Sequence, residues 1–402
     1  MTTSTDLPQL PFERRDVFDV PDRYRTLRAD GPITRVRTQT GDLAWLVTGY
    51  EETRRLLADH RLGRSHPTPD RAARISNSAL FGGPSGDYAT EKATHERMRR
   101  LLAPAFSRRR MNLLREHVQS IVDELLDRMA MLTPPVDLHE ALSFPLPALV
   151  ICELLGVPYE DREHFRALSN RTAGMADAAA SAAAKEELTA YVHGLIAGKR
   201  ATPGEDVISD LVAAADSGRE DLDDDQIATM GTSLLFAGHE TTVARIDFGT
   251  VLLVTHPDQL AALRHDPELV IGAVEEILRI SAPSDHGLPR YARSDIEVGD
   301  VTIRAGDAVL LLNIAANRDE RVFPDPDRFD IFRRSTDPHL GFGYAQHFCI
   351  GASLARVELQ TVFGTLFQRF PTLDLAVPVE RLRRVTQRLT GGFAEVPVTW
   401  ER

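Results

Sequence analysis

Hydrophobic residues recur with the spacing of amphipathic helices through most of residues 91–282. Prolines such as Pro158 interrupt the pattern and divide it into successive helices. The longest uninterrupted stretch runs from about Leu222 to Thr255. The pattern therefore predicts a helical block that contains one long central helix.

Strand-like patterns flank this block on both sides. The runs ITRVRT (33–38) and AWLVTG (44–49) lie between short helical patterns at 21–30 and 50–60. Near the other end, EVGDVTIRAG predicts a hairpin around Gly299-Asp300, and DAVLLLNI is typical of a buried strand. The predicted fold class is mainly α with small β-sheets (α+β).

An alanine-rich segment, AGMADAAASAAAKEE (173–187), interrupts the helical block. Few of its side chains are large and apolar, so it lacks a strong face to bury. We expect a mobile connection between two helices there.

Composition narrows the class of protein. No Pro/Ser/Gly linker or low-complexity run divides the 402 residues, so we expect a single domain over 1–402. A net charge of −12 argues against a nucleic-acid binder. The N-terminus has neither a basic start nor an apolar core, and no run reaches the roughly 18 apolar residues of a membrane span. The sequence predicts a soluble, cytoplasmic monomer that binds no nucleic acid and no membrane.

The chain contains two cysteines, too few for a disulfide framework. Cys152 lies in the apolar run LPALVICELLGVP, which favours a packed core thiol. Cys349 lies instead in HLGFGYAQHFCIGASLARVE (339–358), where a glycine-rich turn runs into an amphipathic helix. A cysteine just before a helix N-terminus has a lowered pKa and suits a metal ligand. A small buried thiol is the competing interpretation.

The string FGYAQHFCIG closely resembles the haem-binding signature of the cytochrome P-450 family, F-G-x-G-x-H-x-C-x-G. Phe342, Gly343, His347, Cys349 and Gly351 match it. The resemblance implies heme b (iron protoporphyrin IX), the Cys349 thiolate as its axial iron ligand, and the family's triangular helical bundle around a buried haem.

One position of this string departs from the family pattern, since Ala345 stands where the family has its second glycine. If the backbone there requires a positive φ, alanine costs on the order of 1 kcal/mol.

The central helix pattern contains a polar run, AGHETT (237–242). Thr241 can return its hydroxyl to the carbonyl of Ala237, and Gly238 makes a local kink easier. A tolerated kink with a surface Glu-Thr pair is the alternative. The run matches the P-450 motif A-G-x-[DE]-T. The resemblance implies that Thr241 hydrogen-bonds iron-bound dioxygen and that Glu240 supports proton delivery.

Glu276 and Arg279, in GAVEEILRI, are three residues apart and can pair on one helix face. Such pairs are common on solvated surfaces. These two also match the family's E-x-x-R, which is joined there by an arginine from a later meander. Arg328, in FPDPDRFD, is the residue that we assign to this position, and the implied role is a buried structural ion network.

The two propionates of a haem require cationic or hydrogen-bonding partners. His95 and Arg99 match the family's H-x-x-x-R, and Arg290 and His347 match two further propionate positions. Residues 91–93, EKA, depart from the D-P-P that many soluble bacterial members have before this motif.

The resemblance implies a monooxygenase that inserts one oxygen atom from O2 into an apolar small molecule, by hydroxylation or epoxidation, in secondary-metabolite tailoring. Electrons would come from a ferredoxin or flavodoxin and its NAD(P)H reductase. Two alternatives stay open: a catalytically silent accessory protein with this fold, and a peroxide-driven haem enzyme.

Overall fold

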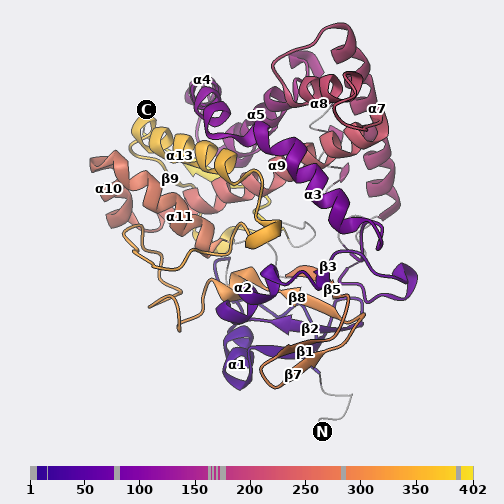
Figure 1. The fold of residues 1–402 in the computed structure, drawn as a ribbon. Coiled ribbons are helices and arrows are strands. Elements are labelled where there is room, and N and C mark those ends of the chain that lie inside the picture. The colour runs from indigo at the N-terminus through magenta and orange to yellow at the C-terminus, as the bar shows by residue number, and fades with distance from the viewer. Residues whose placement is uncertain are drawn as a thin grey trace. The chain divides into compact units, whose positions relative to one another are not determined.

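The computed structural model describes residues 7–15, 17–76, 82–161, 164, 167–168, 171–172, 178–281, 287–385 and 391–401 (Figure 1). The chain divides into two compact units. The first comprises Met1–Thr94 and Ile271–Cys349, and the second comprises His95–Val270 and Ile350–Arg402. Each unit is therefore assembled from two stretches that are far apart in sequence.

A five-stranded sheet with the order β1-β2-β8-β5-β3 forms the base of the first unit. Neighbouring strands are antiparallel, except that β2 and β8 run parallel, with Trp45 opposite Val309. The parallel pair joins the N-terminal stretch to the later one. The strands are β1 (Ile33–Arg37), β2 (Leu43–Val47), β3 (Leu62–Gly63), β5 (Leu288–Ala292) and β8 (Ala308–Leu311).

Both faces of this sheet are covered, because alternate side chains of a strand point to opposite faces. Ala44 and Leu46 belong to one buried cluster, which includes Tyr24 of α1. Val47 belongs to the opposite cluster, which includes Leu56 of α2. The helices of this unit are α1 (Asp22–Asp30), α2 (Tyr50–Ala58), α12 (Asn313–Ala316) and most of α11 (Val270–Ile280), and a hairpin is formed by β6 (Ile296–Val298) and β7 (Val301–Ile303).

The long helix α9 (Asp224–Val254) organises the second unit. It begins with a capping box, in which the Asp223 side chain accepts from the backbone of Gln226 and the Gln226 side chain accepts from the backbone of Asp223. Most of its residues are buried, because α5 (Pro145–Leu155), α7 (Ala178–Ala201) and α13 (Ala352–Arg369) pack around it. Such a helix is apolar on nearly all sides, as its sequence pattern indicates.

Two glycines of α9 allow neighbouring helices to approach closely. A Cβ atom on Gly238 would lie 2.8 Å from Cδ1 of Ile151 on α5, and one on Gly231 would lie 3.0 Å from a methyl group of Val192 on α7. Gly238 therefore leaves room for the Ile151 side chain, in addition to its place in the AGHETT motif.

The remaining elements complete the second unit. A three-stranded sheet has the order β4-β10-β9, and α4 packs along α13. These elements are α3 (Glu91–Leu102), whose first turn belongs to the first unit, α4 (Arg108–Ala130), α8 (Val207–Asp216), α10 (Pro257–His265), β4 (Val136–Asp137), β9 (Asp374–Leu375) and β10 (Pro397–Thr399). In the part of the chain that the structure describes, no helix is long and apolar enough to cross a membrane.

The predicted long helix and the predicted hairpin are confirmed. The prediction of a mobile connection at 173–187 is wrong from Ala178 onward, where α7 begins. Alanine has the highest helix propensity, and Ala184, Leu188 and Val192 form a fully buried stripe at four-residue spacing. Residues 173–177 lie outside the described part of the chain.

Candidate functional site

The loop that carries Cys349 is a tight turn within the first unit. The backbone N–H of Cys349 donates to the carbonyl of Phe342 at 2.9 Å, and that of Gly343 donates to the carbonyl of Leu340 at 2.9 Å. These bonds close the loop and leave the Cys349 side chain exposed. A free cysteine is usually among the most buried residues, so its exposure here disfavours the core-thiol interpretation. Cys152, in contrast, is fully buried in α5, as predicted.

Ala345 has a φ of 53° and Gly343 a φ of 75°, both in the left-handed region. An L-residue other than glycine pays roughly 1–2 kcal/mol for this conformation. Ala345 therefore keeps the backbone conformation for which the family uses glycine, and the strain predicted from the sequence is present. The loop shape is retained at an energetic cost.

The predicted pair of Glu276 and Arg279 lies at the centre of a buried ion network. Nε and Nη2 of Arg279 donate to the two carboxylate oxygens of Glu276 at 2.7 and 2.8 Å. Arg279 also donates to the carbonyls of Asn317 and Pro326, both at 2.8 Å. Both side chains of the pair are almost completely buried, so the pair is not surface decoration.

The second arginine of this network is Arg333, and the assignment of Arg328 is wrong. Nε of Arg333 lies 3.1 and 3.2 Å from the two carboxylate oxygens of Glu276. Arg328 contributes its backbone carbonyl, which accepts from Arg279 at 3.3 Å and from Arg333 at 2.9 Å, while the residue itself is exposed. Arg333 also donates to the carbonyls of Pro324 and Asp325 at 2.6 and 3.1 Å, which holds its guanidinium beside Glu276.

Arg290 on β5 is a buried cation that suits an anionic ligand. It is 7% exposed, and Nη1 donates to the carbonyl of Pro289 at 2.7 Å. Among the described residues, no carboxylate forms an ion pair with it. Burial lowers the pKa of Arg290 to about 9, and the charge of nearby Arg64 adds to the decrease, whereas Glu91 opposes it. A carboxylate brought to this position would remove much of that cost.

Glu91, one of the residues that depart from the family pattern, is a hydrogen-bond centre that sequence reasoning missed. Its carboxylate accepts from the backbone N–H groups of Arg64 and Ser65 at 2.7 and 3.1 Å, and from the Ser65 hydroxyl. It also accepts from Nη2 of Arg293 at 2.6 Å. Burial opposes ionisation, but these hydrogen bonds outweigh it and lower the pKa of Glu91 to about 2.

These bonds tie the first turn of α3 to β3 and to the end of β5. Arg293 also donates to the carbonyl of Tyr88 at 2.8 Å and lies over its ring. A carboxylate in the first turn of a helix is a recognisable signal. Its partners Arg64 and Ser65 lie 27 and 26 residues away, however, and Arg293 lies 202 residues away, and no local pattern marks them.

The AGHETT motif lies in the middle of α9. The Thr241 hydroxyl donates to the carbonyl of Ala237 at 2.9 Å, as predicted. Because its hydrogen is directed at that carbonyl, the hydroxyl presents lone pairs to any further partner. Thr241 is half-buried, whereas Glu240 is 5% exposed. Glu240 and Thr241 thus leave the helix at different azimuths, and the acid is buried, which argues against a surface Glu-Thr pair.

His95 and Arg99 are half-buried residues on α3, one turn apart. Their neighbours Arg97 and Arg100 face acidic groups of the second unit, with Arg100 lying 3.2 Å from Glu220 and Arg97 donating to the carbonyl of Asp221. The helix therefore carries two sets of basic residues: Arg97 and Arg100, which face these groups, and His95 and Arg99, which are the predicted propionate partners.

The predicted residues fall into both units. Cys349, Phe342, Gly343, His347, Arg290 and the Glu276–Arg279–Arg333 network belong to the first. Ala237, Gly238, Glu240, Thr241, His95, Arg99 and Gly351 belong to the second. Gly351 precedes α13 as its N-cap residue.

Comparison with known proteins gives a family-model match over part of the chain and relatives that match nearly all of it. Residues 184–380 match the family model described as Cytochrome P450. Pentalenolactone synthase from Streptomyces exfoliatus is 46% identical over 98% of this chain and 100% of its own length. Vitamin D3 dihydroxylase from Streptomyces griseolus is 40% identical over 99% of this chain and 98% of its own length.

Solved structures match equally well. The putative thioether synthase SgvP, involved in the tailoring of griseoviridin, has a TM-score of 0.91 and 36% identity, over 98% of this chain and 100% of that one. Substrate-free PimD, a pimaricin epoxidase, has a TM-score of 0.88 and 42% identity, over 99% and 100%. With the exposed cysteine on its loop, the buried E-x-x-R network and the acid-threonine pair of α9, these matches show that the chain belongs to the cytochrome P450 family.

Proposed function

We propose that this protein is a haem-thiolate monooxygenase that inserts one oxygen atom from O2 into an apolar small molecule, by hydroxylation or epoxidation, in secondary-metabolite tailoring. The observation that carries the proposal is the exposed Cys349, presented by a closed loop with two left-handed residues. The full-length similarity to P450 enzymes supports it.

The residues of the chain fit a haem, and we propose heme b as the cofactor. Cys349 is a thiol donor that is open to a ligand, and Arg290 is a buried cation suited to a propionate. When bound, haem would supply the O2 chemistry, and the Cys349 thiolate would hold it. We assign the propionates to Arg290, His347, His95 and Arg99.

The remaining predicted residues shape the site and handle protons. Phe342 and Gly343 belong to the cysteine loop, Gly351 is the N-cap residue of α13, and Ala237 and Gly238 shape the surface of α9 at the motif. We assign the delivery of protons to Thr241 and Glu240. Because Glu240 is buried, any proton that it passes on has to be replaced along an internal path.

Relatives indicate the class of substrate. Pentalenolactone synthase, the pimaricin epoxidase PimD and the mycinamicin VIII C21 methyl hydroxylase MycCI carry the names of secondary-metabolite steps. We infer an apolar natural product of polyketide or macrolide type for this chain. A ferredoxin or flavodoxin with its NAD(P)H reductase would supply electrons to a cytoplasmic monomer.

The experiment that tests this proposal is the carbon monoxide difference spectrum of the dithionite-reduced protein. A strongly red-shifted Soret band in the wild type that is absent from Cys349→Ser would establish thiolate ligation. Turnover with hydrogen peroxide is then compared with turnover with ferredoxin and reductase, which separates the peroxide-driven alternative. A purified protein without haem would contradict the enzyme function and favour the accessory-protein alternative.

A further inference from the structure

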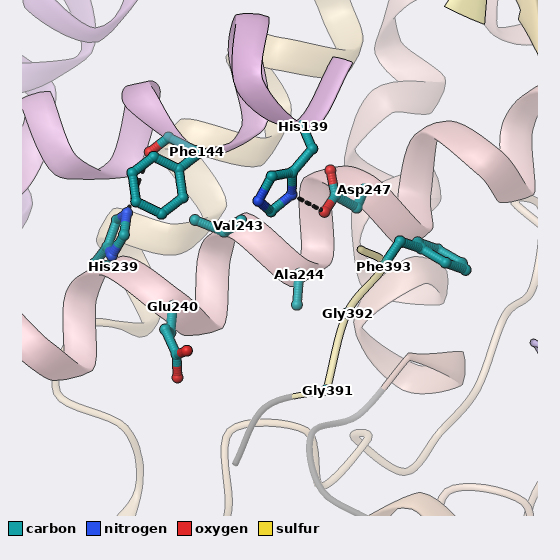
Figure 2. A pocket seen from close by; sticks show the side chains of 10 residues that line it. All are labelled: His139, Phe144, His239, Glu240, Val243, Ala244, Asp247, Gly391, Gly392 and Phe393. Atoms are coloured by element: carbon teal, nitrogen blue, oxygen red, sulfur yellow. Dashed lines mark hydrogen bonds and ion pairs between the residues drawn. The ribbon is translucent and has the colours of Figure 1, made fainter. Parts of the chain in front are cut away.

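A second histidine-carboxylate constellation lies beside the AGHETT motif, entirely within the second unit (Figure 2). Nδ1 of His139 lies 2.7 Å from Oδ2 of Asp247. His139 opens the π-helical turn η3 (His139–Ser143), and Asp247 lies on α9. The contact therefore joins two elements whose residues are more than a hundred positions apart.

The pair shares a small cavity with Glu240. His139, Asp247, Glu240 and His239 line it, together with Phe144, Val243, Ala244 and the segment Gly391–Phe393. Glu240, Ala244 and Asp247 are spaced i, i+4, i+7 and so face the same side of α9, and Figure 2 shows Ala244 between the two acids. The cavity has about 10 Å³ of space for the centre of a water, enough for one water molecule.

Asp247 presents an unused acceptor to this space. Its side chain is completely buried, Oδ2 faces His139, and Oδ1 has no hydrogen-bond partner among the described residues. A buried carboxylate oxygen without a donor is costly, and a polar cavity next to it is suited to a bridging water. The His139 side chain keeps a small exposed fraction, 7%, so it is the end of the pair that solvent can reach.

We propose that the His139–Asp247 pair resupplies protons to Glu240 through a water held in this cavity. This inference rests on the proposed function, in which Glu240 delivers protons. In the step, the water donates one proton to the Glu240 carboxylate and receives one from the protonated pair. His139 then takes one proton from solvent. Only N–H and O–H bonds break and form, one proton moves inward, and no electron is transferred.

His239 has a different environment from His139. Its Nε2–H donates to the backbone carbonyl of Phe144 at 3.2 Å, and its ring meets the Phe144 ring edge to face. A carbonyl partner cannot exchange protons as a carboxylate can. We therefore assign the proton-holding role to His139 and a packing role to His239.

Other charged groups lie on α9 itself or on the segments that pack against it, and they are the same in all variants below. They are Arg245 on α9, Asp137 beside η3, Glu153 on α5, Glu358 on α13, and Arg384 in the segment that precedes Gly391.

The first test uses infrared spectra of the ferric haem-loaded enzyme as a function of pH. The C=O band of protonated Glu240 is identified by its loss in Glu240→Gln. His139→Gln removes the positive member of the pair and raises the midpoint pH of this band, whereas Asp247→Asn removes the negative member and lowers it. One bridging water requires the Glu240 carboxylate and the pair to lie within roughly 6 Å of each other, and at an effective dielectric constant of about 20 each shift is then on the order of one to two pH units.

The matched control is His117→Gln, which alters an exposed histidine that pairs with Glu153; it leaves the midpoint unchanged. Opposite shifts in the two test variants support the proposal. Equal shifts, shifts in the same direction or no shift would overturn it, because they would show that the charged pair does not act on Glu240. The absence of any Glu240 band would overturn it as well.

The second test addresses the water. Ala244→Val fills the cavity without changing charge, and NADPH oxidation with a ferredoxin and its reductase is expected to slow by about tenfold. An unchanged rate would overturn the water path. The wild type and each variant are also checked for the red-shifted carbon monoxide band. Its absence from the wild type would contradict the proposed function and would leave this inference without its basis, whereas its presence in every variant shows that the haem site is intact.

Discussion

Replacing Glu91 with glutamine is expected to lower the stability of the protein above pH 4.5. Glutamine keeps the size of the side chain, but one of its two terminal groups is an NH2, which is itself a donor. All the partners of Glu91 are donors as well, namely the N–H groups of Arg64 and Ser65, the Ser65 hydroxyl and the guanidinium of Arg293. The charge that makes these bonds strong is lost as well.

The magnitude follows from the pKa of Glu91, which falls from 4.5 to about 2 on folding. At about 1.4 kcal/mol per pKa unit, the difference corresponds to roughly 3 kcal/mol of stability. The side chains of Glu91 and Arg293 are 13% and 26% exposed, so solvent screens part of the interaction. We expect Glu91→Gln to reduce the free energy of unfolding at pH 7 by roughly 2 kcal/mol.

The sign of the pH dependence is set by the lowered pKa. Below the folded-state pKa both states are protonated and the contribution vanishes, whereas above pH 4.5 it is fully present. Wild-type stability should therefore fall as the pH drops from about 4.5 towards 2, and the variant should lack this component.

The assay is urea unfolding followed by circular dichroism at several pH values between 3 and 7. Glu51→Gln, an exposed change of the same charge on α2, is the control for net charge. The reasoning would be refuted if Glu91→Gln and the wild type lost stability in parallel between pH 4.5 and 3.

Three further changes test other parts of the site. Ala345→Gly relieves the left-handed strain but frees the unfolded chain, so unfolding experiments should show a net gain of about 0.5–1 kcal/mol; a loss would mean that the loop is not strained. Arg333→Ala leaves the buried Glu276 with one arginine and should cost about 3 kcal/mol, whereas Arg328→Ala keeps the carbonyl and should cost less than about 0.5 kcal/mol; equal costs would contradict the corrected assignment. Arg290→Leu removes a buried cation, so the haem-free protein should be more stable while haem transfer to an acceptor protein becomes faster; unchanged haem transfer would contradict the propionate assignment.

Several features of the molecule could be read from local sequence. The long helix α9, the hairpin at Gly299 and the strands β1, β2 and β8 follow from periodicity and turn residues that act within a few positions. The strain at Ala345 was also predictable, because a family motif specifies a backbone conformation residue by residue. The pairing of Glu276 with Arg279 follows from helical spacing alone.

The choice of partners across long separations depended on the tertiary structure. Whether Arg328 or Arg333 reaches Glu276 depends on how a turn directs two side chains of the same type, and spacing does not distinguish them. The alanine-rich segment became the start of α7, because Ala184 and the leucine and valine that follow it are buried within the second unit.

The sequence by itself determined the long helix α9, the hairpin at Gly299, the cysteine loop and the acid-threonine motif, since those signals are carried by residues within a turn or two of one another. The tertiary structure alone decided that Glu91 meets Arg293 and that His139 meets Asp247. Burial strengthens both contacts by excluding water, and burial depends on packing between elements that no local pattern encodes.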